Sequence, residues 1–163
     1  VGDGPLRQDL EAWVRQQQAQ RLVQMTGWQH DVPACYAALD AVCVTSWNEG
    51  TPVSLIEAMA AGRAVIATDV GGVRDLLGMP EVNIVQIPTG GFHMAARGLL
   101  IRSGDLDGLV AAMTLLAEDV PLRMRLSEAA RAYVAQAHSA QRLLRDMTQF
   151  YEEIRAEERS CMC

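Results

Sequence analysis

The sequence predicts an α/β domain built on a parallel sheet, and three observations carry that prediction. Residues 41–45 and 64–68 are continuous β-prone runs, which is typical of strands buried on both faces. Residues 51–62 between them have the pattern of a helix, so the three segments form a right-handed βαβ unit with parallel strands. Each strand is followed by a polar, glycine-bearing loop, at residues 46–50 and 69–72. Because parallel strands end at one edge of a sheet, both loops are expected at a single ligand-binding edge.

The elements before this unit are short. Residues 2–5 have the composition of a turn that leaves a strand, and apolar residues at helical spacing predict a helix from residue 5 or 6 to about 18. Residues 22–26 form a short apolar segment, which predicts a strand. Asp31 is expected to cap a short helix over residues 32–39.

The elements after the unit become mainly helical. Residues 73–77 predict a short helix, residues 82–87 could form a strand, and residues 98–101 predict an edge strand. Three helices are then expected, over residues 105–118, 121–137 and 139–158, with caps at Asp105 and Ser139. The last helix has an apolar stripe that we expect in the core or against another domain, formed by Leu143, Met147, Phe150 and Ile154.

The composition excludes several classes of function. The chain has 163 residues, half of them hydrophobic, which suits a globular domain with an aliphatic core. The net charge of −6 argues against nucleic acid as a partner. We find neither a bilayer-spanning apolar run nor a signal peptide, so we expect a cytoplasmic protein. Cys161 and Cys163 have no neighbouring His or second Cys pair, so no zinc site is expected there.

Two carboxylates flank the start of the central helix. Glu49 lies in the preceding loop, seven residues separate it from Glu57, and Glu57 is the only charge between residues 51 and 62. Burying a lone carboxylate costs free energy unless hydrogen-bond donors meet it, so Glu57 indicates a ligand. Thr51 is the expected N-cap and Pro52 the first helical residue.

This arrangement predicts a nucleotide-sugar site. The backbone N–H groups of Val53, Ser54 and Leu55, together with the helix dipole, would bind a phosphate or diphosphate. Glu57 could accept two hydrogen bonds from a cis-diol such as a ribose, and Glu49 could do the same for a sugar ring. A diphosphate held between two carboxylates that bind hydroxyl groups describes a nucleotide sugar.

Residues 49–62 resemble the Glu-x7-Glu motif of the GT-B glycosyltransferases of family 4, the retaining group 1 transferases. Further segments resemble that family's donor domain in the same order along the chain, and the resemblance covers about residues 1 to 155. These segments are residues 1–6 (strand and turn), 27–33 (the loop against the base), 64–72 (strand and Gly-Gly loop) and 104–109 (loop and helix start).

The resemblance implies a Rossmann-like three-layer domain, the C-terminal half of a GT-B fold, with a helical C-terminal third. It assigns Glu49 to the transferred sugar, as the catalytic carboxylate, and Glu57 to the ribose. The remaining donor-binding residues that it implies are Gly50, Thr51, Pro52, Val53 and Ser54 for sugar and diphosphate, Gln29, His30, Asp31 and Val32 for the base, and Gly71 and Gly72 after the second strand.

The same resemblance implies the partners. The donor would be a UDP-, GDP- or ADP-linked sugar, bound without a metal or other cofactor. Residues 1–163 would be the donor-binding domain without its first βα unit, and an N-terminal acceptor domain would belong to the same polypeptide. The isolated fragment would then be inactive. The family context implies polysaccharide biosynthesis, with peripheral association at the inner face of a membrane as an option.

Two other functions are alternatives to the transferase. One is a nucleotide-binding or interaction module without catalysis, and it stays open. The other is a dinucleotide-binding oxidoreductase domain, which fails on glycine spacing: after Gly2 and Gly4 a third glycine is required at position 7, where the chain has Arg7.

Overall fold

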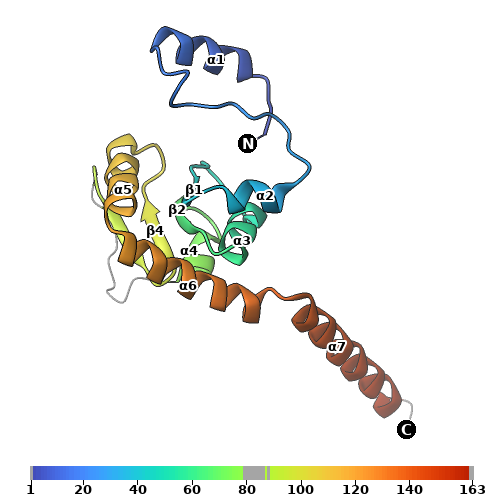
Figure 1. Cartoon of the computed structure of the whole chain (residues 1–163). Helices are drawn as coiled ribbons and strands as arrows, with labels where there is room; N and C mark the ends of the chain where they lie inside the picture. The colour runs from blue at the N-terminus through green and yellow to red at the C-terminus, as the bar shows by residue number, and fades with distance from the viewer. Residues whose placement is uncertain (1, 79–86, 88, 162–163) are drawn as a thin grey trace. The chain divides into compact units, whose positions relative to one another are not determined.

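The computed structural model describes residues 2–78, 87 and 89–161, with side chains through residue 155. The chain divides into two compact units, Val1–Leu39 and Asp40–Cys163. The first unit holds helices α1 (Arg7–Gln16) and α2 (Val32–Ala37), and the second holds all the other elements (Figure 1). Both helices of the first unit lie where the sequence predicts them, to within two residues at each end.

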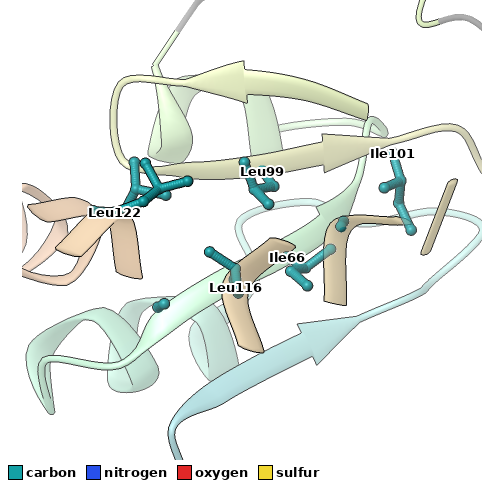
Figure 2. Packing of buried hydrophobic residues seen from close by; sticks show 8 residues of the cluster. Ile66, Leu99, Ile101, Leu116 and Leu122 are labelled. Carbon is teal, nitrogen blue, oxygen red and sulfur yellow. The ribbon is translucent and has the colours of Figure 1, made fainter. Parts of the chain in front are cut away.

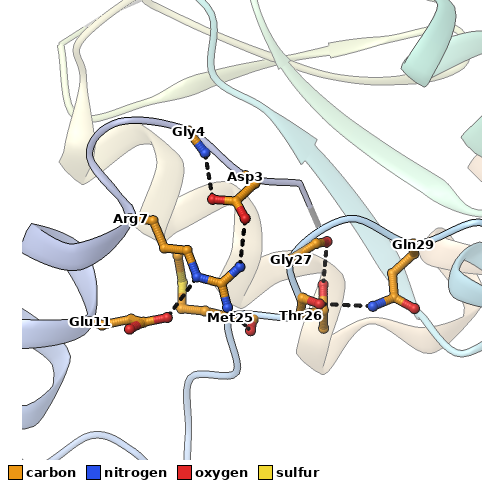
Figure 3. A network of polar contacts seen from close by, with 8 residues as sticks. All are labelled: Asp3, Gly4, Arg7, Glu11, Met25, Thr26, Gly27 and Gln29. Carbon is orange, nitrogen blue, oxygen red and sulfur yellow. Dashed lines mark hydrogen bonds and ion pairs between the residues drawn. The ribbon is translucent and has the colours of Figure 1, made fainter.

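Polar contacts of Arg7 organise the first unit. Its Nε donates to Glu11 Oε1 at 2.8 Å, its Nη1 to Asp3 Oδ2 at 2.9 Å and its Nη2 to the carbonyl oxygen of Met25 at 3.4 Å (Figure 3). Gly27 has φ +66°, and a Cβ there would lie 2.7 Å from Arg7 Nη1. The residue that breaks the dinucleotide-binding glycine pattern therefore ties the start of α1 to residues 25–27.

The strand predicted over residues 22–26 is wrong. The structure has only an isolated antiparallel bridge between Gly2 and Gly27. Leu22 is 89% exposed and Val23 42% exposed. A β-prone run becomes a strand when a neighbouring strand offers hydrogen bonds and a surface to pack on, and the described residues of this unit offer neither along the run.

The second unit is built on a four-stranded sheet in the order β1-β2-β4-β3. The strands are β1 (Ala41–Val44), β2 (Ala64–Thr68), β3 (Phe92–Ala95) and β4 (Gly98–Ile101). β1 and β4 both run parallel to β2, and β3 pairs antiparallel with β4. The predicted βαβ unit is therefore confirmed, with Ala41 paired to Ala64 and Val44 to Ala67.

Two predictions about strand environment are wrong. β1 was expected to be buried on both faces, but it is an edge strand in which Cys43 is exposed and the other residues are half-buried. β4 was expected at the edge, but the chain folds back through Ala96 and Arg97, and β3 takes the edge instead. β3 has no counterpart among the strands that the sequence predicts, and the strand predicted over residues 82–87 lies outside the described residues except for Ile87.

Helices cover both faces of the sheet, as expected for a Rossmann-like three-layer domain. They are α3 (Val53–Ala60), α4 (Val73–Leu77), α5 (Leu106–Glu118) and α6 (Val120–Ala137). The last helix, α7 (Ala140–Cys161), follows α6 in the chain. On one face, alternate residues of β2 and β4 pack against α5 and the start of α6 (Figure 2). The buried members of this cluster are Ala64, Ile66, Leu99, Ile101, Ala112, Leu116, Leu122 and Leu126. Burial of each large aliphatic side chain contributes about 1.5–3 kcal/mol.

The opposite face meets the helices that follow β1 and β2. A Cβ at Gly98 of β4 would lie 2.8 Å from a methyl of Val65 and 3.2 Å from one of Leu77. β4 can therefore lie against β2 and α4 at this point only because residue 98 has no side chain. Arg97 extends the contact by donating to the carbonyl oxygen of Leu76 at 2.7 Å.

Three helices, α2, α5 and α7, begin at the residues predicted to cap them, where a side-chain oxygen accepts a hydrogen bond from a backbone N–H group of the first turn. Asp31 Oδ1 accepts from the Ala34 N–H at 3.0 Å and Asp105 Oδ1 from the Gly108 N–H at 2.9 Å. Ser139 Oγ accepts from the Arg142 N–H at 3.2 Å. α6 begins at Val120, one residue before the predicted Pro121, because the carboxylate of the preceding aspartate caps it.

The apolar stripe of α7 is exposed. The fractions are 64% for Leu143, 44% for Met147, 56% for Phe150 and 37% for Ile154. The stripe therefore lies outside the core of the described structure. Of the two roles expected for it, only contact with another domain remains a prediction.

Candidate functional site

The loop between β1 and α3 places Glu49 at the carboxyl end of the sheet. β1 ends at Val44, and the chain turns through Ser46, Trp47 and Asn48 before it reaches the carboxylate. Glu49 is half-buried, and its Oε1 accepts a hydrogen bond from Ser46 Oγ at 2.6 Å. A bond this short to a carboxylate is strong because the acceptor is charged. The loop therefore holds Glu49 in one orientation.

The start of α3 differs from the prediction by one residue. Thr51 was expected as the N-cap, but Pro52 takes that position, with φ −72° and ψ 106°, and no side chain caps the helix. The carbonyl oxygen of Pro52 accepts from the N–H groups of Leu55 at 3.1 Å and Ile56 at 3.3 Å. Of the three amides expected to face a diphosphate, that of Leu55 is thus already bonded within the first turn.

Glu57 lies on the exposed side of α3. The helix buries Leu55, Ala58 and Met59, which share one face, and Glu57 is exposed. Glu57 therefore has no burial cost that a ligand would need to offset. One side of α3 is open to solvent, and it carries Val53, Ser54 and Glu57.

Glycines of the β2–α4 loop contact the Glu49 loop directly. The N–H of Gly72 donates to the carbonyl oxygen of Gly50 at 3.0 Å. A Cβ at Gly72 would lie 2.5 Å from that oxygen, and a Cβ at Gly71, which has φ +50°, would overlap the carbonyl oxygen of Glu49. The structure thus brings together the two loops that the sequence placed at one edge. Donor binding by Gly71 and Gly72 stays a prediction.

The residues predicted to touch a base lie in the first unit. Gln29 Nε2 donates to the carbonyl oxygen of Thr26 at 2.8 Å, and the Asp31 carboxylate caps α2. His30 is exposed, and Val32 is half-buried at the first position of α2. Two of the four side chains are therefore bonded to neighbouring backbone, and base binding by residues 29–32 stays a prediction.

A pocket of about 240 Å³ lies at the carboxyl ends of β1, β2 and β4, and the sequence analysis did not identify it. The Trp47 indole forms one wall, and a Cβ at Gly104 would lie 2.8 Å from its Cη2. The pocket is lined by Thr45, Trp47, Thr68, Ile101, Arg102, Gly104, Asp105, Leu106 and Leu109. The polar loop after β4 was the available signal, because loops at strand carboxyl ends converge.

Three charged side chains near this edge have polar partners: Arg74 forms an ion pair, and Arg102 and Asp105 form hydrogen bonds. Arg74 makes a two-pronged ion pair with Asp69, which raises the pKa of the Arg74 guanidinium. Arg102 donates to the hydroxyl of Thr89. The backbone N–H of Gly108, followed by that of Gly90, lowers the pKa of the Asp105 carboxyl. These contacts fix the loops after β2 and β4 relative to the sheet.

Within the described ranges, no three His, Cys, Asp or Glu side chains form a group that could hold a metal ion. In the same ranges no helix has the length and apolarity that crossing a bilayer requires. Both statements concern only the described part of the chain.

Comparison with known proteins gives a consistent result. Residues 1–119 match the family model described as glycosyl transferases group 1. A lipopolysaccharide core biosynthesis glycosyltransferase, LpsD of Rhizobium meliloti, is 31% identical over 127 residues, which cover 78% of this chain and 33% of that protein. The 2-deoxystreptamine glucosyltransferase of Streptomyces kanamyceticus is 37% identical over 90 residues, covering 54% of this chain and 23% of the relative. The matched part of the chain thus spans 23–33% of the length of these curated relatives.

Solved structures agree on the fold. Sucrose-phosphate synthase from Thermosynechococcus elongatus superposes with a TM-score of 0.76 at 26% identity, covering 96% of this chain and 37% of that one. HepE from Anabaena, solved in complex with UDP, gives a TM-score of 0.76 at 21% identity, covering 90% of this chain and 36% of that one. The expected likeness to the GT-B superfamily is confirmed at the level of fold and family model.

Proposed function

This chain belongs to the group 1 glycosyl transferases, and from that membership we propose that it supplies the donor-binding half of an enzyme. The enzyme transfers a sugar from a nucleotide-diphosphate sugar to an acceptor. The observation that carries the proposal is the family match over residues 1–119, which includes Glu49 and Glu57 at their seven-residue separation. The structure adds that Glu49 is held at the carboxyl end of a parallel sheet, where such folds bind ligands.

We propose a UDP-linked sugar as the first donor to test, with GDP- and ADP-linked sugars as alternatives. HepE has been solved with UDP and with UDP-glucose, and it shares the fold of this chain. The Escherichia coli relative, 26% identical over 125 residues, is named a UDP-Gal-dependent galactosyltransferase. Both observations support the uracil base without fixing the sugar.

In the proposed complex the diphosphate lies at the amino end of α3, where the helix dipole and the first-turn amides favour negative charge. Glu57 accepts hydrogen bonds from the ribose hydroxyls, and residues 29–32 offer backbone to the base. Glu49 faces the transferred sugar and stabilises the positive charge that develops as its bond to the diphosphate breaks. No metal is required, and transfer with retention, as in family 4, is the stereochemistry that we propose.

The acceptor is proposed to bind a second domain of the same polypeptide. Relatives named for lipopolysaccharide core and teichuronic acid biosynthesis support a polysaccharide or glycolipid acceptor. With a polymer or lipid acceptor of that kind, we propose that the enzyme acts in the cytoplasm beside the inner face of a membrane. Without the second domain this chain is expected to bind donor without completing transfer.

Calorimetric titration with UDP, GDP and ADP and with their glucose conjugates tests the proposal. We expect one nucleotide to bind more tightly than the others and Glu57→Ala to weaken it about 10- to 100-fold, since hydrogen bonds to a charged group are lost. Glu118→Ala, at the exposed end of α5, is the control and should leave binding unchanged. Equal weak binding of all nucleotides, insensitive to Glu57→Ala, would instead indicate a module without donor specificity.

A further inference from the structure

A chain of two hydrogen bonds runs from the interior of the sheet to Glu49. Thr68 is the last residue of β2 and is 1% exposed. Its Oγ1 donates to the carbonyl oxygen of Ser46 at 2.6 Å. Ser46 Oγ in turn donates to Glu49 Oε1 at 2.6 Å. The orientation of the half-buried carboxylate is therefore connected to a strand that is buried along its whole length.

The backbone beside Glu49 is fixed by the same β2–α4 loop. Gly72 donates to the carbonyl oxygen of Gly50 at 3.0 Å, and Gly71 leaves no room for a Cβ beside the carbonyl oxygen of Glu49. The N–H of Asp69, which follows Thr68, donates to the carbonyl oxygen of Ile101 at 2.8 Å and so continues the pairing of β2 with β4. The β1–α3 loop is thus held from one side by a segment that is itself part of the sheet.

Each hydroxyl has one proton to donate, and both protons are committed. The Ser46 hydroxyl donates its proton to the Glu49 carboxylate, and this charge-assisted hydrogen bond restricts the rotamer of Glu49. The Thr68 hydroxyl donates its proton to the carbonyl oxygen of Ser46, and this bond fixes the position of the Ser46 backbone that carries the hydroxyl. A carboxylate that stabilises charge in a transition state must already be oriented, because a displacement of about 1 Å costs about 100-fold in rate.

We propose that Ser46 and Thr68 are positioning residues for Glu49 in the glycosyl transfer reaction. Ser46 acts on the carboxylate directly, and Thr68 acts through the backbone of Ser46. This inference rests on the proposed function, since it assumes that Glu49 faces the transferred sugar. It predicts that the two hydroxyls affect recognition of the sugar and leave recognition of the nucleotide alone.

The test is the ratio of UDP-glucose affinity to UDP affinity, measured by calorimetry on the whole chain, with GDP- and ADP-linked pairs in parallel. The variants are Ser46→Ala, Thr68→Val and Glu49→Gln. We expect each to lower the ratio about 5- to 10-fold, because hydrogen bonding to or through a charged group is lost, while UDP affinity stays within about twofold. Ser46→Thr and Thr68→Ser keep the hydroxyls and should restore the ratio.

Two controls separate positioning from loss of folding. Thr148→Val removes a hydroxyl that donates to the carbonyl oxygen of Leu144 within α7, and it should change neither affinity. Thermal melting identifies any variant that unfolds. Ser46 is only half-buried, so Ser46→Ala provides the measurement if Thr68→Val does not fold. A variant that is merely destabilised would lower both affinities together and leave the ratio unchanged.

The outcomes distinguish the two proposals. If Glu49→Gln lowers the ratio but Ser46→Ala does not, the positioning role is overturned and the proposed function stands. If Glu49→Gln leaves the ratio unchanged, or if the chain binds no nucleotide sugar, the proposed function fails and the positioning role fails with it. In the complete polypeptide, Ser46→Ala should lower kcat about 10- to 100-fold and raise the KM for donor by about the 5- to 10-fold expected for UDP-glucose affinity, and Ser46→Thr should recover both.

Discussion

The two units differ in how much hydrophobic surface they bury. Among the described residues of the first unit, only one hydrophobic side chain, that of Val14, is buried, whereas in the second unit every residue of β2 is buried. The apolar side chains of α1 are largely exposed apart from Val14, with Leu10 48% and Trp13 58% exposed. The first unit depends on the contacts of Arg7, and the second on packing between a sheet and helices.

The difference bears separately on two predictions, the base contact at residues 29–32 in the first unit and the sugar contact at Glu49 in the second. The loop expected to touch the base belongs to the unit with little buried surface, so ordering it on a ligand has a free-energy cost. Glu49 belongs to the well-packed unit and is held before any ligand arrives. We therefore expect sugar recognition to be preorganised and base recognition to require local ordering.

The largest expected effect is on the core of the second unit. Leu99→Ala removes a side chain that is 0% exposed and packed between β2 and α5, and should lower the free energy of unfolding by about 2–5 kcal/mol. Leu10→Ala in α1, where the side chain is 48% exposed, should change it by less than about 0.5 kcal/mol. Urea unfolding measures both. Similar losses in the two variants would show that the first unit is packed as tightly as the second.

A somewhat smaller effect is expected where the two loops touch. Gly71→Ala places a Cβ against the carbonyl oxygen of Glu49 at a residue with φ +50°. Overpacking and left-handed backbone together should cost about 2–4 kcal/mol. Gly50→Ala is the matched control for stability, because a Cβ there has open space. A Gly71→Ala variant as stable as the control would mean that the loops separate at little cost.

Helix caps provide a finer comparison of the units. Asp119→Ala removes the acceptor that holds the Leu122 N–H at 2.8 Å and should cost about 1 kcal/mol in the unfolding of the second unit. Asp31→Ala removes the corresponding cap of α2 in the first unit. Because α2 buries no residue, we expect that loss to appear as faster amide exchange in α2 without a shift in the main unfolding transition. A shift as large as that of Asp119→Ala would contradict the distinction.

The smallest expected effect is a pH dependence at Asp105. The backbone N–H groups of Gly108 and Gly90 hold the pKa of this carboxyl below its ordinary value. The carboxylate therefore stabilises the fold at pH above about 4, and that contribution is lost as pH falls through the folded-state pKa. Asp105→Asn should show a smaller drop in melting temperature between pH 5 and pH 3 than the unmodified chain. Glu118→Gln is the control, and an unchanged drop in Asp105→Asn would refute the assignment.

Most of the fold was predictable because its signals are local. The runs at residues 41–45 and 64–68 and the polar caps of α2, α5 and α7 each specify an element within a few residues. Glu49 and the contact of its loop with Gly71 and Gly72 followed from one rule about parallel strand ends. The predictions that failed concern neighbours: a strand at residues 22–26 without a partner, and the edge positions of β1 and β4.

The sequence by itself determined the βαβ unit, the family motif and the pairing of β1 with β2, because residue spacing and hydrophobic pattern carry that information along the chain. Only the tertiary structure decided that Glu57 faces outward, that Pro52 replaces Thr51 as the cap, and that Thr68 reaches Glu49 through Ser46. The last of these facts depends on two segments meeting although Ser46 and Thr68 are 22 positions apart in the sequence. A contact at that distance has no periodic signature in the sequence, because packing, and not local preference, selects it.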